Sequence, residues 1–206
     1  MVLTSLPKFI LDHYEVHEWK HASAILATDF PSEWKDIIDA LTAFRLLRSE
    51  IEAAGGGFSP ISRRLDNEFK SRGWETKMFH TKVVIDEAEL ETPTHKVDCF
   101  KNRVALEVEW NNKTEFYDRD LNNFRLLFDL RAVSVGVIVT RCTHLGDLFK
   151  QLGKWGSYGT TSTHMDRLVP RLQGGSGAGC PVLAFGISQK LYVDDIKAGH
   201  VGKVAP

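Results

Sequence analysis

Residues 95–113 read HKVDCFKNRVALEVEWNNK, and this stretch predicts the centre of the fold. From residue 103 onward the side chains alternate with a period of two, which is typical of a β-strand with one face in a core. The core face is expected to carry Val104, Leu106, Val108 and Trp110. Glu107 and Glu109 then lie on the opposite face with Ala105, and strand rise separates the two glutamates by roughly 7 Å.

The preceding residues 94–100 predict an antiparallel partner strand, joined through a two-residue turn at Lys101-Asn102. In this register Asp98 lies opposite Ala105 and diagonal to Glu107, on the same face as both glutamates. Three carboxylates on one patch repel one another unless a cation lies among them. A hard divalent ion such as Mg²⁺, bound by carboxylates, water and phosphate oxygens, relieves that repulsion.

The spacing of Asp98, eight residues and then Glu107-Val108-Glu109 resembles the PD-(D/E)xK nuclease core, in the variant with Glu where Lys usually stands. The continuation EWNNK and the upstream segments FSPIS and FKSRGWE resemble the BglII/BstYI group of type II restriction endonucleases. This resemblance runs from about residue 34 to residue 187. An acidic hairpin formed by chance is the alternative interpretation of the spacing alone.

The resemblance implies an α/β fold, with a mixed central sheet flanked by helices in an αβα sandwich. It also implies a homodimer that cleaves double-stranded DNA within a short palindrome and uses Mg²⁺. Asp98, Glu107 and Glu109 would be catalytic, and Asp98, Glu107 and the Val108 carbonyl would bind the metal. Glu109 could orient or deprotonate the attacking water, or bind a second metal. Related enzymes place a further acidic or amide residue near residues 74–80, where Glu75 and Lys77 are candidates.

Two segments are candidates for DNA contact. Asn111, Asn112 and Lys113 follow the acidic strand, and two amides and an ammonium suit base edges and phosphates; a simple strand-end turn is the alternative. Residues 153–179 are rich in Gly, Ser and Thr, and in the resembling enzymes a loop in this region enters the major groove. Its candidate DNA-contacting residues are Ser157, Tyr158, Thr160, Thr161, Ser162, Thr163 and His164. One of these hydroxyls is expected to cap the helix that follows.

The rest of the chain predicts helices and strands around this centre. An amphipathic helix should begin at Pro31-Ser32 and end at residues 55–57, and a second should run from Ser59-Pro60 to Gly73. Further elements are expected as a strand at 74–80, an acidic surface turn at 86–92, helices at 120–130 and 145–152, and buried strands at 134–140 and 181–187. We expect one domain over residues 1–206, with 1–30 as an N-terminal extension and 188–206 as a tail or short edge element.

Composition narrows the functional classes. The chain has 206 residues, 43% of them hydrophobic, which suits one domain with a sizeable core. Its net charge of −1 is unusually neutral for a DNA-binding protein. Three separated cysteines, no signal pattern and no apolar run of membrane-spanning length favour a reducing cytoplasm and no membrane partner. The resemblance to restriction endonucleases implies that the cell is prokaryotic.

Two other functions remain open from the sequence. A DNA-binding protein of the same fold with weak or lost cleavage would keep the fold, but the complete acidic set argues against that loss. A carboxylate-metal hydrolase acting on a small phosphorylated substrate would need a closed pocket, whereas the long polar loop suits an extended ligand.

Overall fold

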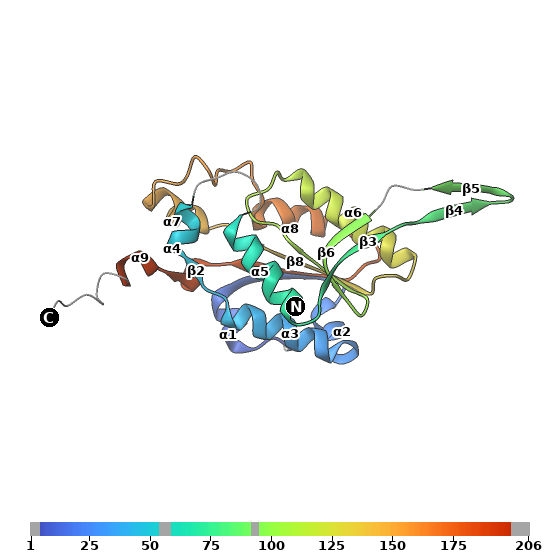
Figure 1. Cartoon of the computed structure of the whole chain (residues 1–206), viewed down its shortest axis with the longest axis horizontal. Coiled ribbons are helices and arrows are strands. Elements are labelled where there is room, and N and C mark those ends of the chain that lie inside the picture. The colour runs from blue at the N-terminus through green and yellow to red at the C-terminus, as the bar shows by residue number, and fades with distance from the viewer. Residues whose placement is uncertain (1–4, 54–58, 92–94, 199–206) are drawn as a thin grey trace.

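The centre of the molecule is a six-stranded mixed sheet with the strand order β1-β9-β8-β7-β6-β3. The computed structural model describes residues 5–53, 59–91 and 95–198 of the chain (Figure 1). The strands of this sheet are β1 (Tyr14–Trp19), β3 (Glu75–Phe79), β6 (His95–Lys101), β7 (Val104–Val108), β8 (Val135–Arg141) and β9 (Val182–Ile187). β7, β8 and β9 are parallel, and the remaining neighbours pair antiparallel.

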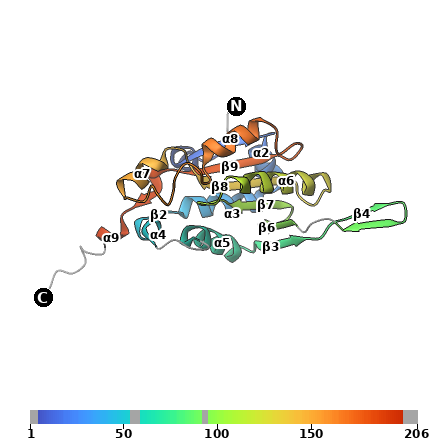
Figure 2. The same ribbon diagram turned by 90° about the horizontal axis from the view of Figure 1, so that it is seen from above.

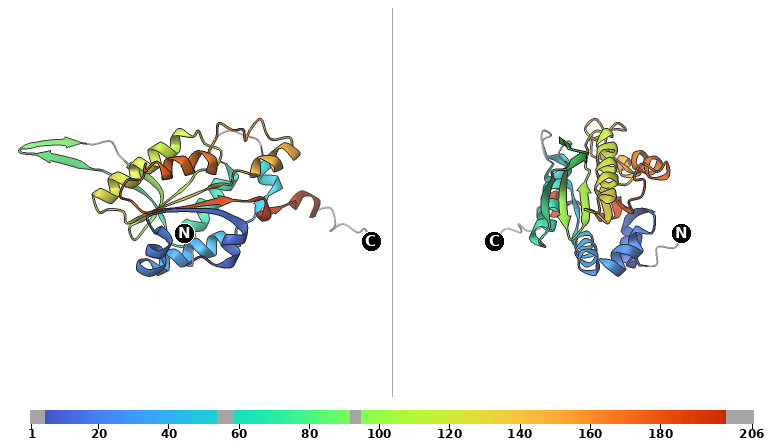
Figure 3. Two further views of the ribbon diagram at one scale, coloured as in Figure 1. Left: turned by 180° about the vertical axis from the view of Figure 1, so that it is seen from behind. Right: turned by 90° about the vertical axis from the view of Figure 1, so that its right-hand side faces the viewer.

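Helices cover both faces of the sheet, as the end-on view in Figure 3 shows. One apolar core joins the sheet to α1 (Lys8–His13), α2 (Ala22–Asp29), α3 (Pro31–Ala43), α5 (Pro60–Ser71) and α7 (Leu145–Gln151). The second core, on the opposite face, joins it to α6 (Glu115–Asp129) and α8 (Met165–Gln173). The αβα sandwich expected from the sequence is therefore confirmed.

Smaller elements complete the described chain. The strand β2 (Leu46–Leu47) pairs in parallel with β10 (Tyr192–Val193), and they are accompanied by α4 (Arg48–Glu52), the 3-10 helix η1 (Gln189–Leu191) and α9 (Asp195–Ala198). The stretch 1–30, set apart as an extension, contributes β1 to one edge of the central sheet, where it pairs with β9. Residues 188–198 likewise contribute short structure rather than a plain tail.

The alternation of β7 is confirmed, and it divides the strand between the two cores. Val104, Leu106 and Val108 pack into the first core, whereas Ala105 packs into the second. The buried central strand is also confirmed, since every residue of β8 is buried. A strand buried on both faces needs helices on both sides, and it carries the continuous apolar run seen in its sequence.

The hairpin turn lies one residue later than the sequence predicts. Asn102 and Arg103 both have positive φ, 44° and 68°, which is the conformation of a tight two-residue hairpin turn. Cys99 consequently pairs with Leu106, and Phe100, not Asp98, lies opposite Ala105. The predicted register is therefore wrong by two residues. A shift of two by itself keeps each side chain on its own face, and Asp98 lies one residue beyond the part of β6 that pairs with β7.

Two predicted helices have different bounds. The helix that begins at Pro31 ends at Ala43, because Phe44 turns extended and is buried, and Arg45 donates to the carbonyls of Thr42 and Phe44. The chain then forms β2 and α4 instead of one long helix. The second helix, α6, begins at Glu115 and not at residue 120, because the buried Tyr117 belongs to the same apolar stripe as the residues after position 120.

The predicted acidic surface turn is a second β-hairpin. Its strands are β4 (Lys82–Ile85) and β5 (Ala88–Glu91), with the turn at Asp86, whose φ is 52°. The hairpin extends away from the sandwich, as Figures 1 and 2 and the left view of Figure 3 show. Position 92, the last of the predicted turn, lies outside the described residues.

Candidate active site

Four carboxyl groups meet on the side of the sheet that α6 covers. The ladder between β6 and β7 places Asp98 beside Glu107, and the main-chain nitrogen of Asp98 lies 3.4 Å from Oε2 of Glu107. Glu109 follows the end of β7, where its main-chain N–H donates to the carbonyl of Val139 on β8. The fourth acid is Asp120 of α6, which the sequence analysis did not select. Glu107, Glu109 and Asp120 are 1%, 1% and 0% exposed.

Asp120 reaches this site because it lies on the inward face of its helix. Tyr117, Leu121 and Phe124 form the apolar stripe of α6, and Asp120 lies within that stripe. Seen from above in Figure 2, α6 crosses over the strands that end at the site. An acid within an apolar stripe is a signal that the sequence did contain, since carboxylates are seldom fully buried without a partner.

Burial keeps protons on this cluster when no cation lies among the acids. The pKa of Glu109 is raised to about 9, chiefly by burial and then by the charge of the neighbouring Asp120, against the lowering effect of a hydrogen bond from Asn112. The pKa of Glu107 is raised well above its ordinary value by burial and by the charges of Asp120 and Asp98. Burial also raises the pKa of Asp120. Mutual repulsion and loss of water therefore both disfavour the state in which Glu107, Glu109 and Asp120 are all ionised.

Two basic side chains flank the acids. Lys96, two residues before Asp98 on β6, donates to Oδ1 of Asp98 at 2.7 Å. Arg119 donates through Nε and Nη2 to Oδ1 of Asp120, at 2.9 and 2.7 Å, and Nη2 lies 3.4 Å from Oε1 of Glu109. The Arg119 side chain is 49% exposed and lies over the ring of Phe116. Arg119 thus brings a half-exposed positive charge beside Glu109 and Asp120.

The donor set fits a hard divalent cation. Oε1 of Glu107 and Oδ2 of Asp120 are buried and make no hydrogen bond, so two carboxylate oxygens remain available inside the cluster. In the described part of the chain, no three acidic, histidine or cysteine side chains converge closely enough to hold an ion as they stand. The hydrogen bonds explain why, because Asp98, Glu109 and Asp120 point partly toward protein donors. Carboxylate oxygens are nevertheless the ligands that Mg²⁺ prefers.

A further buried acid lies on α5, whereas the candidates on β3 are exposed. Glu75 and Lys77 pair with each other on the surface, with 62% and 43% of their side chains exposed. Asp66 of α5 is instead 6% exposed, and burial together with the charge of Asp98 raises its pKa to about 6. Its Oδ1 accepts a long contact, 4.0 Å, from the Sγ of Cys99. Asp66 is therefore a buried acid on the α5 side of the sheet, close enough to Asp98 for its pKa to respond to that charge.

The predicted DNA-contacting residues divide into buried and exposed groups. Tyr158 is 7% exposed and stacks on Phe149, and Thr163 is fully buried, so neither side chain is available to DNA in this conformation. The Thr163 hydroxyl binds main-chain atoms of Glu109 and Asn112. The N-cap residue of α8 is His164, which makes no side-chain cap, so the predicted hydroxyl cap is wrong. The exposed candidates are Ser157, Thr160, Thr161 and Lys113. The partly exposed candidates are Asn111, Asn112, Ser162 and His164.

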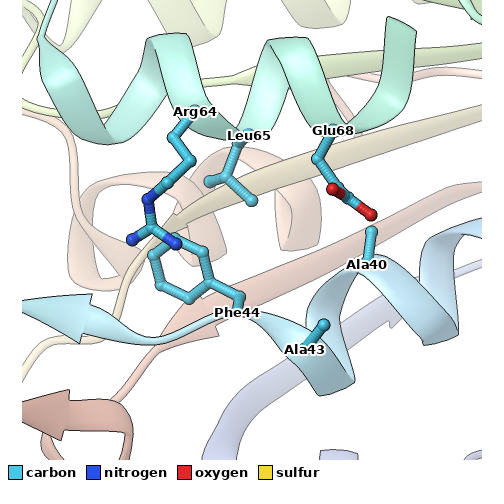
Figure 4. A pocket seen from close by; sticks show the side chains of 6 residues that line it. All are labelled: Ala40, Ala43, Phe44, Arg64, Leu65 and Glu68. Atoms are coloured by element: carbon cyan, nitrogen blue, oxygen red, sulfur yellow. The ribbon is translucent and has the colours of Figure 1, made fainter. Parts of the chain in front are cut away.

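A small groove lies apart from the acids, between α3 and α5 (Figure 4). It has a volume of about 120 Å³ and is lined by Ala40, Ala43, Phe44, Arg64, Leu65 and Glu68. Its charged groups have partners, since Arg64 binds Glu50 and Arg72 binds Glu68. The groove lies at a helix contact and provides no group for chemistry.

An acidic hairpin at one end of a mixed sheet, enclosed by helices on both faces, is the architecture of a restriction-endonuclease-like domain. The model of the family described as restriction endonuclease BglII/BglIII matches residues 14–187, and the chain belongs to this family of DNA-cleaving enzymes. No curated protein matched the chain. Within the described residues, no helix has both the length and the apolar character needed to span a membrane.

Proposed function

We propose that this protein is a Mg²⁺-dependent, sequence-specific endonuclease that cuts both strands of DNA within a short palindrome. The observation that carries the proposal is the contact between Asp98 and Glu107 at the end of a hairpin, beside the buried acids Glu109 and Asp120. Membership of a restriction endonuclease family supplies the substrate, double-stranded DNA. A palindrome is cut on both strands by two sites related by a two-fold axis, so we propose a homodimer.

Asp98, Glu107 and the Val108 carbonyl would hold the metal, using oxygen ligands of the kind that Mg²⁺ prefers. Bound there, Mg²⁺ lowers the pKa of a water ligand and neutralises charge developing on the scissile phosphate. The side chain of Val108 packs into the core behind the site, which fixes the position of its main chain. Lys96 must give up its bond to Asp98, and at 57% exposure it can do so toward solvent or toward DNA phosphate.

Glu109 would act on the attacking water. With a pKa of about 9, this carboxyl carries a proton at neutral pH until positive charge reaches the site. Arg119, beside Glu109 and Asp120, favours its ionised form and can contact a phosphate oxygen through its exposed part. As a carboxylate, Glu109 would orient the water or accept its proton; the binding of a second metal is the other role open to it.

DNA contact is proposed for the segments that follow β7 and precede α8. Asn111, Asn112 and Lys113 would meet base edges and phosphates, together with Ser157, Thr160, Thr161, Ser162 and His164. Tyr158 and Thr163 would support this surface from below, because both are buried. The neutral net charge is accounted for by the acids of the site and of the β4–β5 hairpin, which offset the basic residues elsewhere.

The test is a digest of long unmethylated DNA with the purified protein, with and without Mg²⁺. Discrete Mg²⁺-dependent fragments are expected, and Glu107→Ala should abolish them. Glu89→Ala, which removes a carboxylate from the exposed β5, is the matched control and should cut normally. Absence of cleavage under every divalent ion, with DNA binding retained in Ca²⁺, would replace the enzyme with a DNA-binding protein of the same fold.

A further inference from the structure

The segment after β7 is interlocked with the loop before α8. Thr163 N–H donates to the Asn112 carbonyl at 2.9 Å, and Asn112 N–H donates to the Thr163 hydroxyl at 3.1 Å. Lys113 and Ser162 form an isolated antiparallel bridge next to these bonds. The Thr163 hydroxyl also donates to the Glu109 carbonyl at 3.2 Å. The two segments proposed to meet DNA therefore form one unit with the main chain of Glu109.

The side chain of Asn112 is bonded to the acidic site itself. Its Nδ2 donates to Oε2 of Glu109 at 2.7 Å. This contact is possible because Asn111 adopts a left-handed conformation, φ 60°, and turns the chain so that Asn112 folds back over the residue three positions earlier. Glu109 thus has one oxygen on the Asn112 amide and the other near Arg119.

The loop that carries Thr163 is held by a buried arginine. Arg141, at the end of β8, is 2% exposed, and its Nε and Nη2 donate to Thr163 O, Gly159 O and the Ser162 hydroxyl, at 2.9, 2.9 and 2.7 Å. Its guanidinium also lies over the ring of Phe149. All its hydrogen bonds in the described structure go to this one loop. The loop before α8 and the segment that carries Asn112 are therefore held together, so DNA that contacts one of them also affects the other.

We propose that Asn112 is a positioning residue that couples DNA recognition to the chemistry of the site. This proposal rests on the proposed endonuclease function. In the DNA-free protein its amide holds Oε2 of Glu109. A base edge or phosphate at the specific site competes for the same amide, and Glu109 is then released toward the reacting phosphate. An Asn amide suits this exchange, because one side chain offers both donor and acceptor to a base edge.

A purely structural role for Asn112 makes a different prediction. The main-chain bonds of Asn112 to Thr163 do not depend on its side chain, so the local fold should survive replacement by Ala. If the amide only contacts a base, its loss should slow cleavage at the specific site and leave other DNA as resistant as before. If the amide also restrains Glu109, its loss should speed cleavage of other DNA in absolute terms. That gain separates the two roles.

The experiment compares Asn112→Ala with the unmodified protein on DNA that contains the specific site and on DNA with one base pair of that site changed. Asn122→Ala is the matched control, because Asn122 is an exposed amide on α6 that accepts a hydrogen bond from Arg125. Thermal unfolding of each variant checks the fold. We expect Asn112→Ala to cut the changed site about tenfold faster than the unmodified protein, the order expected for one hydrogen bond. The control should cut both DNAs normally.

The outcomes separate this inference from the proposed function. If the unmodified protein cuts DNA and Asn112→Ala shows no gain on the changed site, the coupling is rejected and the endonuclease remains. If the unmodified protein does not cut DNA at all, both are rejected. Asn112→Asp provides a second variant, because a carboxylate at this position cannot donate to Glu109. It should show the same gain on the changed site.

Discussion

The chain contains two acid-rich hairpins that differ in the surroundings of their carboxylates. In the β4–β5 hairpin the acids at positions 86, 87, 89 and 91 are all exposed, and Glu89 pairs only with the exposed Lys82. In the β6–β7 hairpin Glu107 is 1% exposed, and α6 adds the buried Asp120 beside it. The same residue type is thus solvated in one hairpin and removed from water in the other.

This difference shows what distinguishes a reactive site from an acidic surface. Exposed carboxylates are stabilised by water and interact weakly with one another. Buried carboxylates lose that solvation, and near one another they retain protons until a cation replaces them. The burial of Glu107, Glu109 and Asp120 therefore creates a place that favours a cation, whereas the β4–β5 hairpin does not.

The largest expected difference between the hairpins is in cleavage. Asp98→Asn removes a proposed metal ligand without changing the shape of the side chain, and Asp86→Asn makes the same change in the exposed turn. We expect Asp98→Asn to slow cleavage about a thousandfold or more, since a bound metal contributes several kcal/mol to transition-state stabilisation. Asp86→Asn should be unaffected, because Asn tolerates the left-handed conformation at this position. Single-turnover rates in excess Mg²⁺ measure both.

Equal rates for Asp98→Asn and the unmodified protein would show that Asp98 is not a ligand. Binding of both variants to DNA in Ca²⁺ is the control for folding and for DNA contact. A loss of binding as well as cleavage in Asp98→Asn would indicate that the carboxylate supports DNA binding through the cation.

Much of the fold could be predicted because its local patterns agree with its packing. The alternation of β7 indicated the two faces, and Ser59 and Pro60 indicated the start of α5, where the Ser59 hydroxyl does accept from Ser62 N–H. The turn at Asn102-Arg103 was missed, since Lys101-Asn102 fits a two-residue turn equally well in sequence. A shift of two by itself leaves strand faces unchanged, because they repeat every two residues.

The site was less predictable where it depends on distant contacts. Asp120 comes from α6 and Asp66 from α5, and no spacing within the acidic hairpin indicates either residue. The ion pairs of Arg119 with Asp120 and Glu109 depend on how α6 packs on the sheet, which the helical pattern alone does not give. Thr163 and Tyr158 are polar residues in a polar loop, so their burial could not be inferred from composition.

A smaller difference is expected in the stability of the metal-free protein. The folded-state pKa of Glu109, about 9, lies above its ordinary value of 4.5, so the folded protein keeps a proton that the unfolded chain releases between these values. The free energy of unfolding should therefore fall as pH rises through this window. Between pH 7 and 8.5 the Tm should fall by several degrees, since 1 kcal/mol corresponds to about 2–4 °C in a chain of this size.

Glu109→Gln tests the origin of that slope, because Gln cannot release a proton. Its Tm should depend less on pH over the same range, whereas Glu89→Gln on the exposed hairpin should keep the slope of the unmodified protein. An identical slope in all three proteins would show that Glu109 does not retain its proton. Scanning calorimetry in the presence of a chelator makes the measurement without a bound metal.

The smallest effect is expected where the exposed hairpin loses an ion pair. Lys82 and Glu89 are 2.9 Å apart, but their side chains are 55% and 61% exposed, so water and salt screen the attraction. Lys82→Gln should change the free energy of unfolding by no more than about 0.5 kcal/mol, as is usual for exposed pairs. Urea unfolding measures the change. A loss above about 1 kcal/mol would contradict the solvated description of the β4–β5 hairpin, because only a pair shielded from water could contribute that much.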